Sequence, residues 1–140
     1  MTGAADPDGP AMMREEAERL LSACSIHRDM GLKLVDWEKG RVRFTFAPPT
    51  SVRSGDGGVI HGGAVATALD TAACFAVIAA VGKDCSTVDL RTDFLRPGSA
   101  DQLSVTGTLL RAGRRFGWAD AAITTSDGKA VATARGTFTW

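Results

Sequence analysis

Hydrophobic and polar positions follow two different periods along this chain. Between residues 41 and 47, Val42, Phe44 and Phe46 alternate with mostly polar side chains, and this period of two predicts a half-buried strand. Residues 64–82 are instead apolar almost all round and rich in alanine, which predicts one long buried helix. The same reasoning predicts a short amphipathic helix at 12–23 and further strands at 32–38, 86–95, 101–110, 115–125 and 130–139.

The links between the predicted strands are short and contain glycine and proline. Short links of this kind favour antiparallel neighbours. We therefore predict an α+β fold with one domain, residues 14–140, in which two strands and a later four-strand meander form one antiparallel sheet around a central helix. Residues 1–13 are expected to form a flexible tail.

The composition narrows the class of protein. The formal net charge is zero and the pI is about 6.7, so no overall field favours nucleic acid or an acidic membrane, and neither is expected as a partner. Three widely spaced cysteines without a C-x-x-C pair argue against a disulfide framework or a zinc site, and no metal is expected. No secretion signal is visible, which favours a cytoplasmic protein.

Asp70 is the one residue within 62–82 that is charged at neutral pH. Ionised carboxylates are rarely buried without a partner, because desolvating one costs on the order of several kcal/mol. Two interpretations remain open. Asp70 is either a catalytic or ligand-binding acid, or part of a solvent-facing polar stripe with Thr67, Thr71 and Cys74.

The predicted helix begins at Gly62 and Gly63. Backbone N–H groups in a first helical turn have no partner within the helix, so these glycines either form an oxyanion site or only permit a tight turn. Gly62 and Asp70 are separated by about 12 Å along the axis, at roughly 1.5 Å per residue. One carbonyl group cannot reach both, so a site that uses both residues requires two antiparallel copies of the helix, and hence a homodimer.

Several short motifs together resemble a known family. They are the run Gly58-Val59-Ile60-His61-Gly62-Gly63, Asp70 nine positions after the histidine, and the later runs Thr87-Val88-Asp89-Leu90 and Phe94-Leu95-Arg96-Pro97. In this pattern the chain resembles the hotdog-fold thioesterases of the PaaI-like group, which is named for phenylacetate degradation. The resemblance implies a hotdog domain with its active site between two subunits, and dimers that often pair into tetramers.

The resemblance also implies roles for individual residues. Asp70 would be the general base or nucleophile in hydrolysis of an acyl-CoA, and the Gly62 amide would polarise the thioester carbonyl. Thr87 would position the water, His61 would orient the carbonyl site, and Gly63 would lie against the substrate. Coenzyme A would be part of the substrate, and no separate cofactor is implied.

The chain departs from the family pattern in the loop before the helix. Many relatives carry an asparagine six positions before the motif histidine, where this chain has Gly55. Ser54 and Asp56 flank that position and are candidates to replace the asparagine in holding substrate or water.

Four arginines are candidates for contact with the nucleotide end of coenzyme A: Arg96, Arg111, Arg114 and Arg115. Guanidinium groups pair well with phosphates, although charged residues at a hairpin tip also serve simply to keep a strand end soluble.

Two other functions are compatible with the same fold. A non-catalytic acyl-CoA-binding protein would keep the apolar pocket and the arginines but would not need Asp70. A hydroxyacyl-CoA dehydratase would use His61 as its base.

Overall fold

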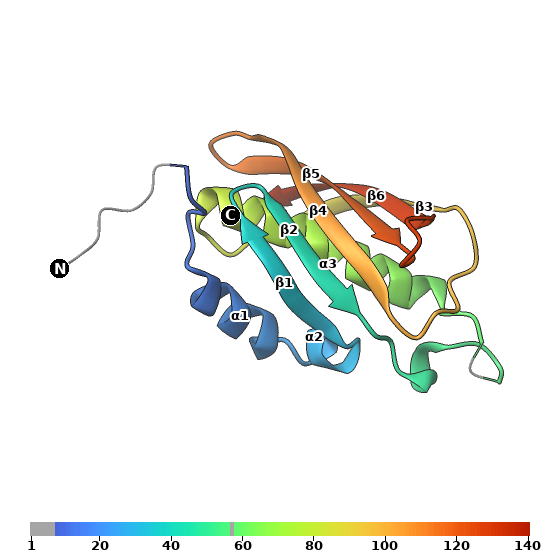
Figure 1. Cartoon of the computed structure of the whole chain (residues 1–140). Helices are drawn as coiled ribbons and strands as arrows, with labels where there is room; N and C mark the ends of the chain where they lie inside the picture. Colours follow the sequence, from blue (N-terminus) through green and yellow to red (C-terminus); the bar gives the residue numbers. More distant parts are fainter. Residues whose placement is uncertain (1–7, 57) are drawn as a thin grey trace.

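A computed structural model of the protein describes residues 8–56 and 58–140. Figure 1 shows one curved sheet with a long helix across one face. The helices are α1 (Arg14–Ala23), α2 (Ser25–Asp29) and α3 (Gly62–Val81), with a 3₁₀ turn at Thr50–Val52. The strands are β1 (Leu32–Glu38), β2 (Arg41–Phe46), β3 (Ser86–Phe94), β4 (Leu103–Ala112), β5 (Phe116–Thr124) and β6 (Ala130–Thr139). The predicted strands agree with these to within two residues at each end, and the short helix α2 was not predicted.

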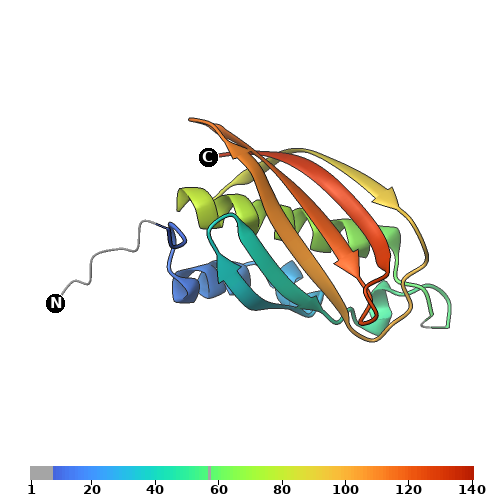
Figure 2. The same cartoon turned by 45° about the horizontal axis from the view of Figure 1, so that its top comes forward.

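The six strands form a single antiparallel sheet in the order β1-β2-β4-β5-β6-β3. The prediction of one antiparallel sheet around one central helix is confirmed, and Figure 2 shows the sheet curling over α3. The predicted four-strand meander is wrong. Only β4, β5 and β6 form a meander, whereas β3 pairs with β6 at the far edge and β4 pairs with β2.

The physical reason lies in the link 95–102 between β3 and β4. This link does not turn back as a hairpin but passes the start of α3, where the Gly98 carbonyl accepts a 2.8 Å hydrogen bond from the Ile60 N–H. The Arg53 guanidinium reinforces it by donating to the carbonyls of Ser99 and Ala100. β3 is thereby placed at one edge of the sheet, where β5 and β6 separate it from β4.

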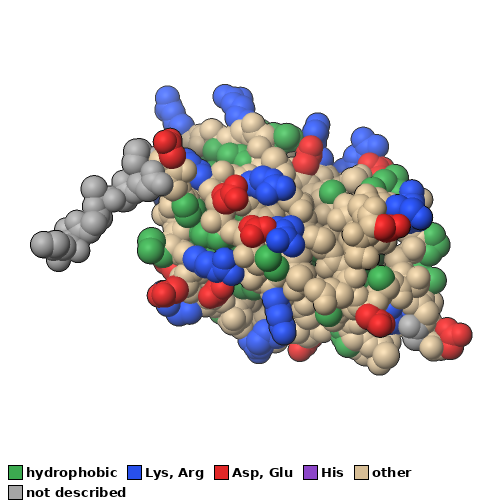
Figure 3. Space-filling view, in the orientation of Figure 1, with side chains coloured by type: hydrophobic (Ala, Val, Ile, Leu, Met, Phe, Trp, Pro, Cys, Tyr) green, Lys and Arg blue, Asp and Glu red, His purple; other side chains and the backbone are tan. Residues whose placement is uncertain are grey.

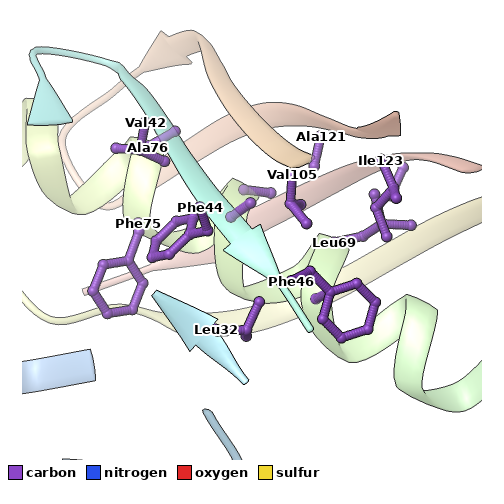
Figure 4. Close-up of a cluster of buried hydrophobic side chains, with 14 of the residues drawn as sticks. Leu32, Val42, Phe44, Phe46, Leu69, Phe75, Ala76, Val105, Ala121 and Ile123 are labelled. Carbon is purple, nitrogen blue, oxygen red and sulfur yellow. The ribbon is translucent and has the colours of Figure 1, made fainter. Parts of the chain in front are cut away.

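The core lies between α3 and the sheet. Phe44, Phe46, Leu69 and Ile123 are fully buried there (Figure 4). The sheet approaches α3 so closely that a Cβ atom at Gly107 would overlap the carbonyl oxygen of Ala72. Glycine on β4 and alanine on α3 are therefore what allow the sheet to wrap around the helix.

The end of the predicted flexible tail packs against the domain. The Ala11 N–H donates to the Ala79 carbonyl at 2.7 Å, Met12 is buried, and the Met12 carbonyl accepts from the Trp37 indole at 2.8 Å. Residues 1–7 of the predicted tail lie outside the described residues.

Charged side chains of both signs are interspersed on the face shown in Figure 3. Arg43 pairs with Asp36 at 2.7 Å, and Arg135 on β6 pairs with Asp120 on β5. By length and composition, α3 is the one helix among the described residues that could cross a membrane, and it is mostly buried against the sheet in this fold.

Candidate active site

Asp70 lies near the middle of α3, half-buried and bonded to a residue of the edge strand. The Thr87 hydroxyl donates a 2.8 Å hydrogen bond to Asp70 Oδ1. The alternative of a solvent-facing stripe is wrong for Thr71, which is buried, whereas Thr67, Asp70 and Cys74 are half-buried. The Thr67 and Thr71 hydroxyls bond back to carbonyls of their own helix, at 2.9 and 2.8 Å. Unlike these two hydroxyls, the Asp70 carboxylate is bonded to another element of the fold, strand β3.

A β-bulge turns Thr87 toward Asp70. Thr87 pairs with Phe138 and Asp89 with Thr137, so Val88 is an extra residue in β3. Asp89, Arg91 and Asp93 line the outer face of the sheet. Thr87 would share that face if the alternation were unbroken, because strand side chains alternate with a period of two. The bulge places it on the helix side instead, a common use of bulges beside functional sites.

Asp70 and Thr87 line a pocket of about 450 Å³ between α1, α2, α3 and the start of β3. Its wall is partly apolar and partly polar, and includes Leu20, His27, Phe75, Asp84 and the three cysteines. A pocket of this mixed character beside a half-buried acid is typical of a small-molecule site.

Burial raises the pKa of Asp70 above its ordinary value of 3.8. The Thr87 hydrogen bond and the nearby His27 side chain act in the opposite sense, since both favour the ionised carboxylate. A carboxylate whose pKa is raised is a better proton acceptor, which suits a general base.

His27 is a pocket residue that the sequence interpretation missed. Its Nδ1–H donates to the Leu21 carbonyl at 2.9 Å, and this bond fixes the orientation of the ring. The ring meets Phe75 edge-on, with centroids 6.1 Å apart. His27 belongs to α2, 43 positions before Asp70, and no local motif connects the two.

The start of α3 is capped by its own histidine. His61 Nδ1 accepts a 2.9 Å hydrogen bond from the Gly63 N–H, and the His61 N–H donates to the Val52 carbonyl at 2.7 Å. The Gly63 amide predicted to meet substrate is therefore already bonded within the chain. Gly62 is the first residue of the helix, where an N–H has no partner within the helix, and the Phe94 ring lies beside it.

Ser54 and Asp56 lie in an exposed loop that leads into α3. The Ser54 N–H donates to the Val59 carbonyl at 2.7 Å, and Arg53 and Ile60 form an isolated antiparallel bridge. Gly55, between them, has a φ of 51°, a left-handed conformation that glycine and asparagine adopt most readily. The structure does not bring Ser54 or Asp56 to Asp70 within one chain.

The four arginines occupy opposite ends of β5. Arg111, Arg114 and Arg115 surround the β4–β5 turn with Phe116 and Trp118, and the Arg111 guanidinium lies 5.9 Å from the Trp118 ring centre. The Arg96 N–H instead bonds to the Val131 carbonyl, beside the β5–β6 turn. Within one chain, Arg96 is therefore separated from the other three.

Comparisons with known proteins agree with this geometry. The family model of the thioesterase superfamily matches residues 57–132, which include Gly62, Asp70 and Thr87. A medium/long-chain acyl-CoA thioesterase of Salmonella typhimurium, YigI, is 30% identical over 81% of this chain and 83% of its own length. The chain therefore belongs to the thioesterase superfamily.

Solved structures share its fold. The PaaI protein of the Escherichia coli phenylacetic acid degradation operon has the same fold, with a TM-score of 0.81, 24% identity, and coverage of 89% of this chain and 90% of that one. A Streptococcus mutans protein bound to acetyl CoA has a TM-score of 0.70 and 26% identity, over 77% of this chain and 86% of that one. The protein is a hotdog acyl-CoA thioesterase that is similar to the PaaI group, as the sequence motifs predicted.

Proposed function

We propose that the protein hydrolyses acyl-CoA with Asp70 as the general base or nucleophile. The Gly62 amide of a second copy would donate a hydrogen bond to the thioester carbonyl. The observation that carries this proposal is the Thr87 hydrogen bond to a half-buried Asp70 inside a pocket. The two residues come from different elements, and their contact orients a carboxylate whose pKa burial has raised.

The edge strand supports a two-copy site. Among the described residues, β3 is an edge strand with one unpaired side, and almost all of its residues are exposed, including Val88 and Phe94. Exposed strand edges pair readily with another strand. Thr87, near its start, contacts Asp70, and Phe94, at its end, lies beside Gly62. Two β3 strands paired antiparallel, with Thr87 opposite Phe94 of the second copy, would bring Asp70 of one copy to Gly62 of the other.

The same pairing of two β3 strands would also bring the four candidate arginines to one end of the site. Phe116 and Ser86 both pair with Thr139 of β6, so the β4–β5 turn lies at the end of the sheet where β3 begins. In the antiparallel dimer, Arg96 of the second copy comes to this end. Arg111, Arg114 and Arg115 of one copy and Arg96 of the other would then flank one site. We propose that they bind the phosphates of coenzyme A, with Phe116 and Trp118 as an aromatic surface beside them.

The chemistry of the proposed site can be followed atom by atom. A water molecule between Asp70 and the thioester attacks the carbonyl carbon and gives its proton to Asp70. The carbonyl oxygen becomes an oxyanion that accepts from the Gly62 N–H at the positive end of α3. The intermediate then collapses, the carbon–sulfur bond breaks, and the proton passes from Asp70 to the thiolate of coenzyme A. Direct attack by Asp70 would give an acyl anhydride that water then hydrolyses, with the same products.

The pocket supports a straight-chain acyl group. Leu20, Ala23 and Phe75 provide an apolar wall next to Asp70. A relative at 30% identity is named for medium/long-chain acyl-CoA, and we propose medium chains as the preferred substrates. Phenylacetyl-CoA, suggested by the PaaI resemblance, is the competing class. We further propose a cytoplasmic homodimer that can pair into a tetramer.

The experiment that tests this function is a thiol-release assay. Purified protein is given a panel of acyl-CoAs, with straight chains of increasing length beside phenylacetyl-CoA and hydroxyphenylacetyl-CoA. Release of coenzyme A that is fastest with medium chains supports the proposal. Binding of acyl-CoA without release would favour the non-catalytic binding protein, and hydration or dehydration of a hydroxyacyl chain without release would favour the dehydratase.

A further inference from the structure

All three cysteines of the chain line the pocket that contains Asp70. They come from separate elements: Cys24 lies between α1 and α2, Cys74 on α3, and Cys85 just before β3. Cys24 is exposed, and the other two are half-buried. Nothing in the proposed hydrolysis uses a thiol, so their convergence on one pocket needs a separate explanation.

Cys74 and Cys85 are in direct contact. Cys74 Sγ lies 3.7 Å from the Cys85 carbonyl oxygen, to which it donates, and each thiol shifts the pKa of the other. In its thiol form Cys85 donates to the Lys83 carbonyl at 3.3 Å. Within the part of the chain that the structure describes, no group of histidine, cysteine and acidic side chains could hold a metal ion. The contact is therefore one between two free thiols.

The two thiols are inequivalent. The hydrogen bond from Cys74 lowers the pKa of Cys85, whereas the same bond, together with burial, raises the pKa of Cys74. One sulfur is thus favoured as the thiolate and the other as the proton donor. A reactive dithiol has this arrangement, because the thiolate is the nucleophile in thiol oxidation.

Their positions connect them to the catalytic pair. Cys74 follows Asp70 by one helical turn on α3, and Cys85 precedes Thr87 by two residues. A covalent bond between the sulfurs would tie the start of β3 to α3 immediately beside the hydrogen bond between Thr87 and Asp70.

We propose that Cys74 and Cys85 form a reversible disulfide, which makes the pocket wall a site of oxidative modification. With a peroxide as oxidant, the Cys85 thiolate attacks one oxygen, the O–O bond breaks, and Cys85 becomes a sulfenic acid while hydroxide leaves. The Cys74 sulfur then attacks the Cys85 sulfur, and the departing hydroxide takes the Cys74 proton to form water. Peroxide is reduced to water, the two thiols are oxidised, and a dithiol reductant reverses the reaction.

The disulfide has a consequence for hydrolysis that rests on the proposed function. Bonded sulfurs lie about 2.05 Å apart, much closer than two thiols in van der Waals contact, so the segment before Thr87 must move toward α3. A shift of about 1 Å in a positioning group can lower turnover by roughly a hundredfold. Oxidation is therefore expected to lower thioesterase turnover at least about tenfold, and reduction to restore it.

The test measures disulfide formation directly and needs no substrate. Reduced protein is treated with a small excess of hydrogen peroxide, remaining thiols are alkylated, and the protein is examined by intact mass and peptide mapping. We expect two thiols to be lost, a peptide pair joined through Cys74 and Cys85, and Cys24 still open to alkylation. Dithiothreitol should return all three thiols. A disulfide through Cys24, irreversible oxidation of Cys85 alone, or three thiols that all remain free would overturn the proposal.

Two variants give matched controls. Cys24→Ser should form the disulfide as the unaltered protein does, and Cys85→Ser should form none. In the turnover assay, each variant is compared with its own reduced form, and loss on oxidation is expected for Cys24→Ser but not for Cys85→Ser. An unchanged turnover after full disulfide formation would contradict the effect on catalysis. If the disulfide forms but the reduced protein releases no coenzyme A, the proposed function is contradicted, whereas the proposal of a reversible disulfide still holds.

Discussion

The Thr87 hydroxyl and the Asp70 carboxylate meet at 2.8 Å although seventeen positions separate them in the chain. One lies at the start of the edge strand and the other in the middle of the central helix. Their contact engages Oδ1 of Asp70, and in the proposed mechanism Oδ2 is the oxygen that receives the proton from water. The relationship links the fold of the protein to its chemistry, because it depends on β3 lying at the edge of the sheet and on the bulge at Val88.

Replacing Thr87 by valine should weaken catalysis and shift its pH dependence. The Thr87 hydrogen bond lowers the pKa of Asp70, so its loss raises that pKa further. Because the ionised carboxylate is the active form, the acid limb of kcat/KM should move to higher pH, and kcat should fall about tenfold, the usual worth of a hydrogen bond to a charged group. Thr87→Ser keeps the hydroxyl and should behave like the unaltered protein. An unchanged pH profile for Thr87→Val would show that the bond has no catalytic role.

Asp70→Asn should stabilise the fold at neutral pH. Burial, the largest influence on this group, raises the pKa of Asp70, so the folded protein holds that proton more tightly than the unfolded chain does. The free energy of unfolding therefore falls as pH rises from 3.8 through the folded pKa, and it stays lower above it. Asparagine is uncharged, so its burial does not carry the desolvation cost of an ionised carboxylate. Tm at pH 7 should therefore rise by about 2–4 °C. At pH 3 the two proteins should melt together. A lower Tm for Asp70→Asn at pH 7 would contradict this.

Subunit complementation tests whether the site is shared between two copies. Asp70→Asn removes the acid, and Gly62→Pro removes the amide donor. Proline is well tolerated in the first helical turn, and His61 already has the extended backbone that a residue before proline needs. Each variant alone should be inactive. A mixed dimer, formed by coexpression with two different affinity tags, contains one doubly altered site and one intact site.

The mixed dimer should therefore recover about half the turnover of the unaltered dimer, because a site shared between copies can be rebuilt from two defective chains. Coexpressed chains that both carry Asp70→Asn are the matched control and should stay inactive. Mixed dimers without activity would place Asp70 and its carbonyl donor in the same chain.

The arginines of the β4–β5 turn should act on the nucleotide end of the substrate. Replacing Arg114 and Arg115 by alanine should raise KM for acyl-CoA about tenfold, with little change in kcat, since phosphate contacts are made equally in the ground and transition states. The corresponding acyl-pantetheine lacks the nucleotide and should show no rise in KM. Equal effects on both substrates would remove these arginines from phosphate binding.

Local patterns in the sequence were sufficient for most of the fold. The alternation in β2 and the alanine-rich run of α3 each report a burial pattern that persists in the structure. The partner of β3 could not be predicted in this way. Turn residues indicate where a strand ends but not which strand it meets, and the link 95–102 is fixed by tertiary bonds to Arg53 and Ile60.

The candidate site was predictable only in part. Asp70 could be recognised from its isolation in an apolar helix, and Thr87 from the family resemblance. A regular period of two does not predict the bulge that turns Thr87 toward the helix. His27 lies on a five-residue helix, which is too short to show a clear amphipathic pattern in the sequence. The capping role of His61 also depends on a side-chain geometry that the motif alone does not give.

The most direct measurement compares the unaltered protein with Asp70→Asn in thiol release from a medium-chain acyl-CoA, with acyl-CoA binding measured in parallel by calorimetry. If Asp70 acts on the attacking side, turnover should fall by at least about a hundredfold while binding persists, since loss of a general base typically costs 10²–10⁴-fold. Turnover by Asp70→Asn within a few-fold of the unaltered protein would contradict the account.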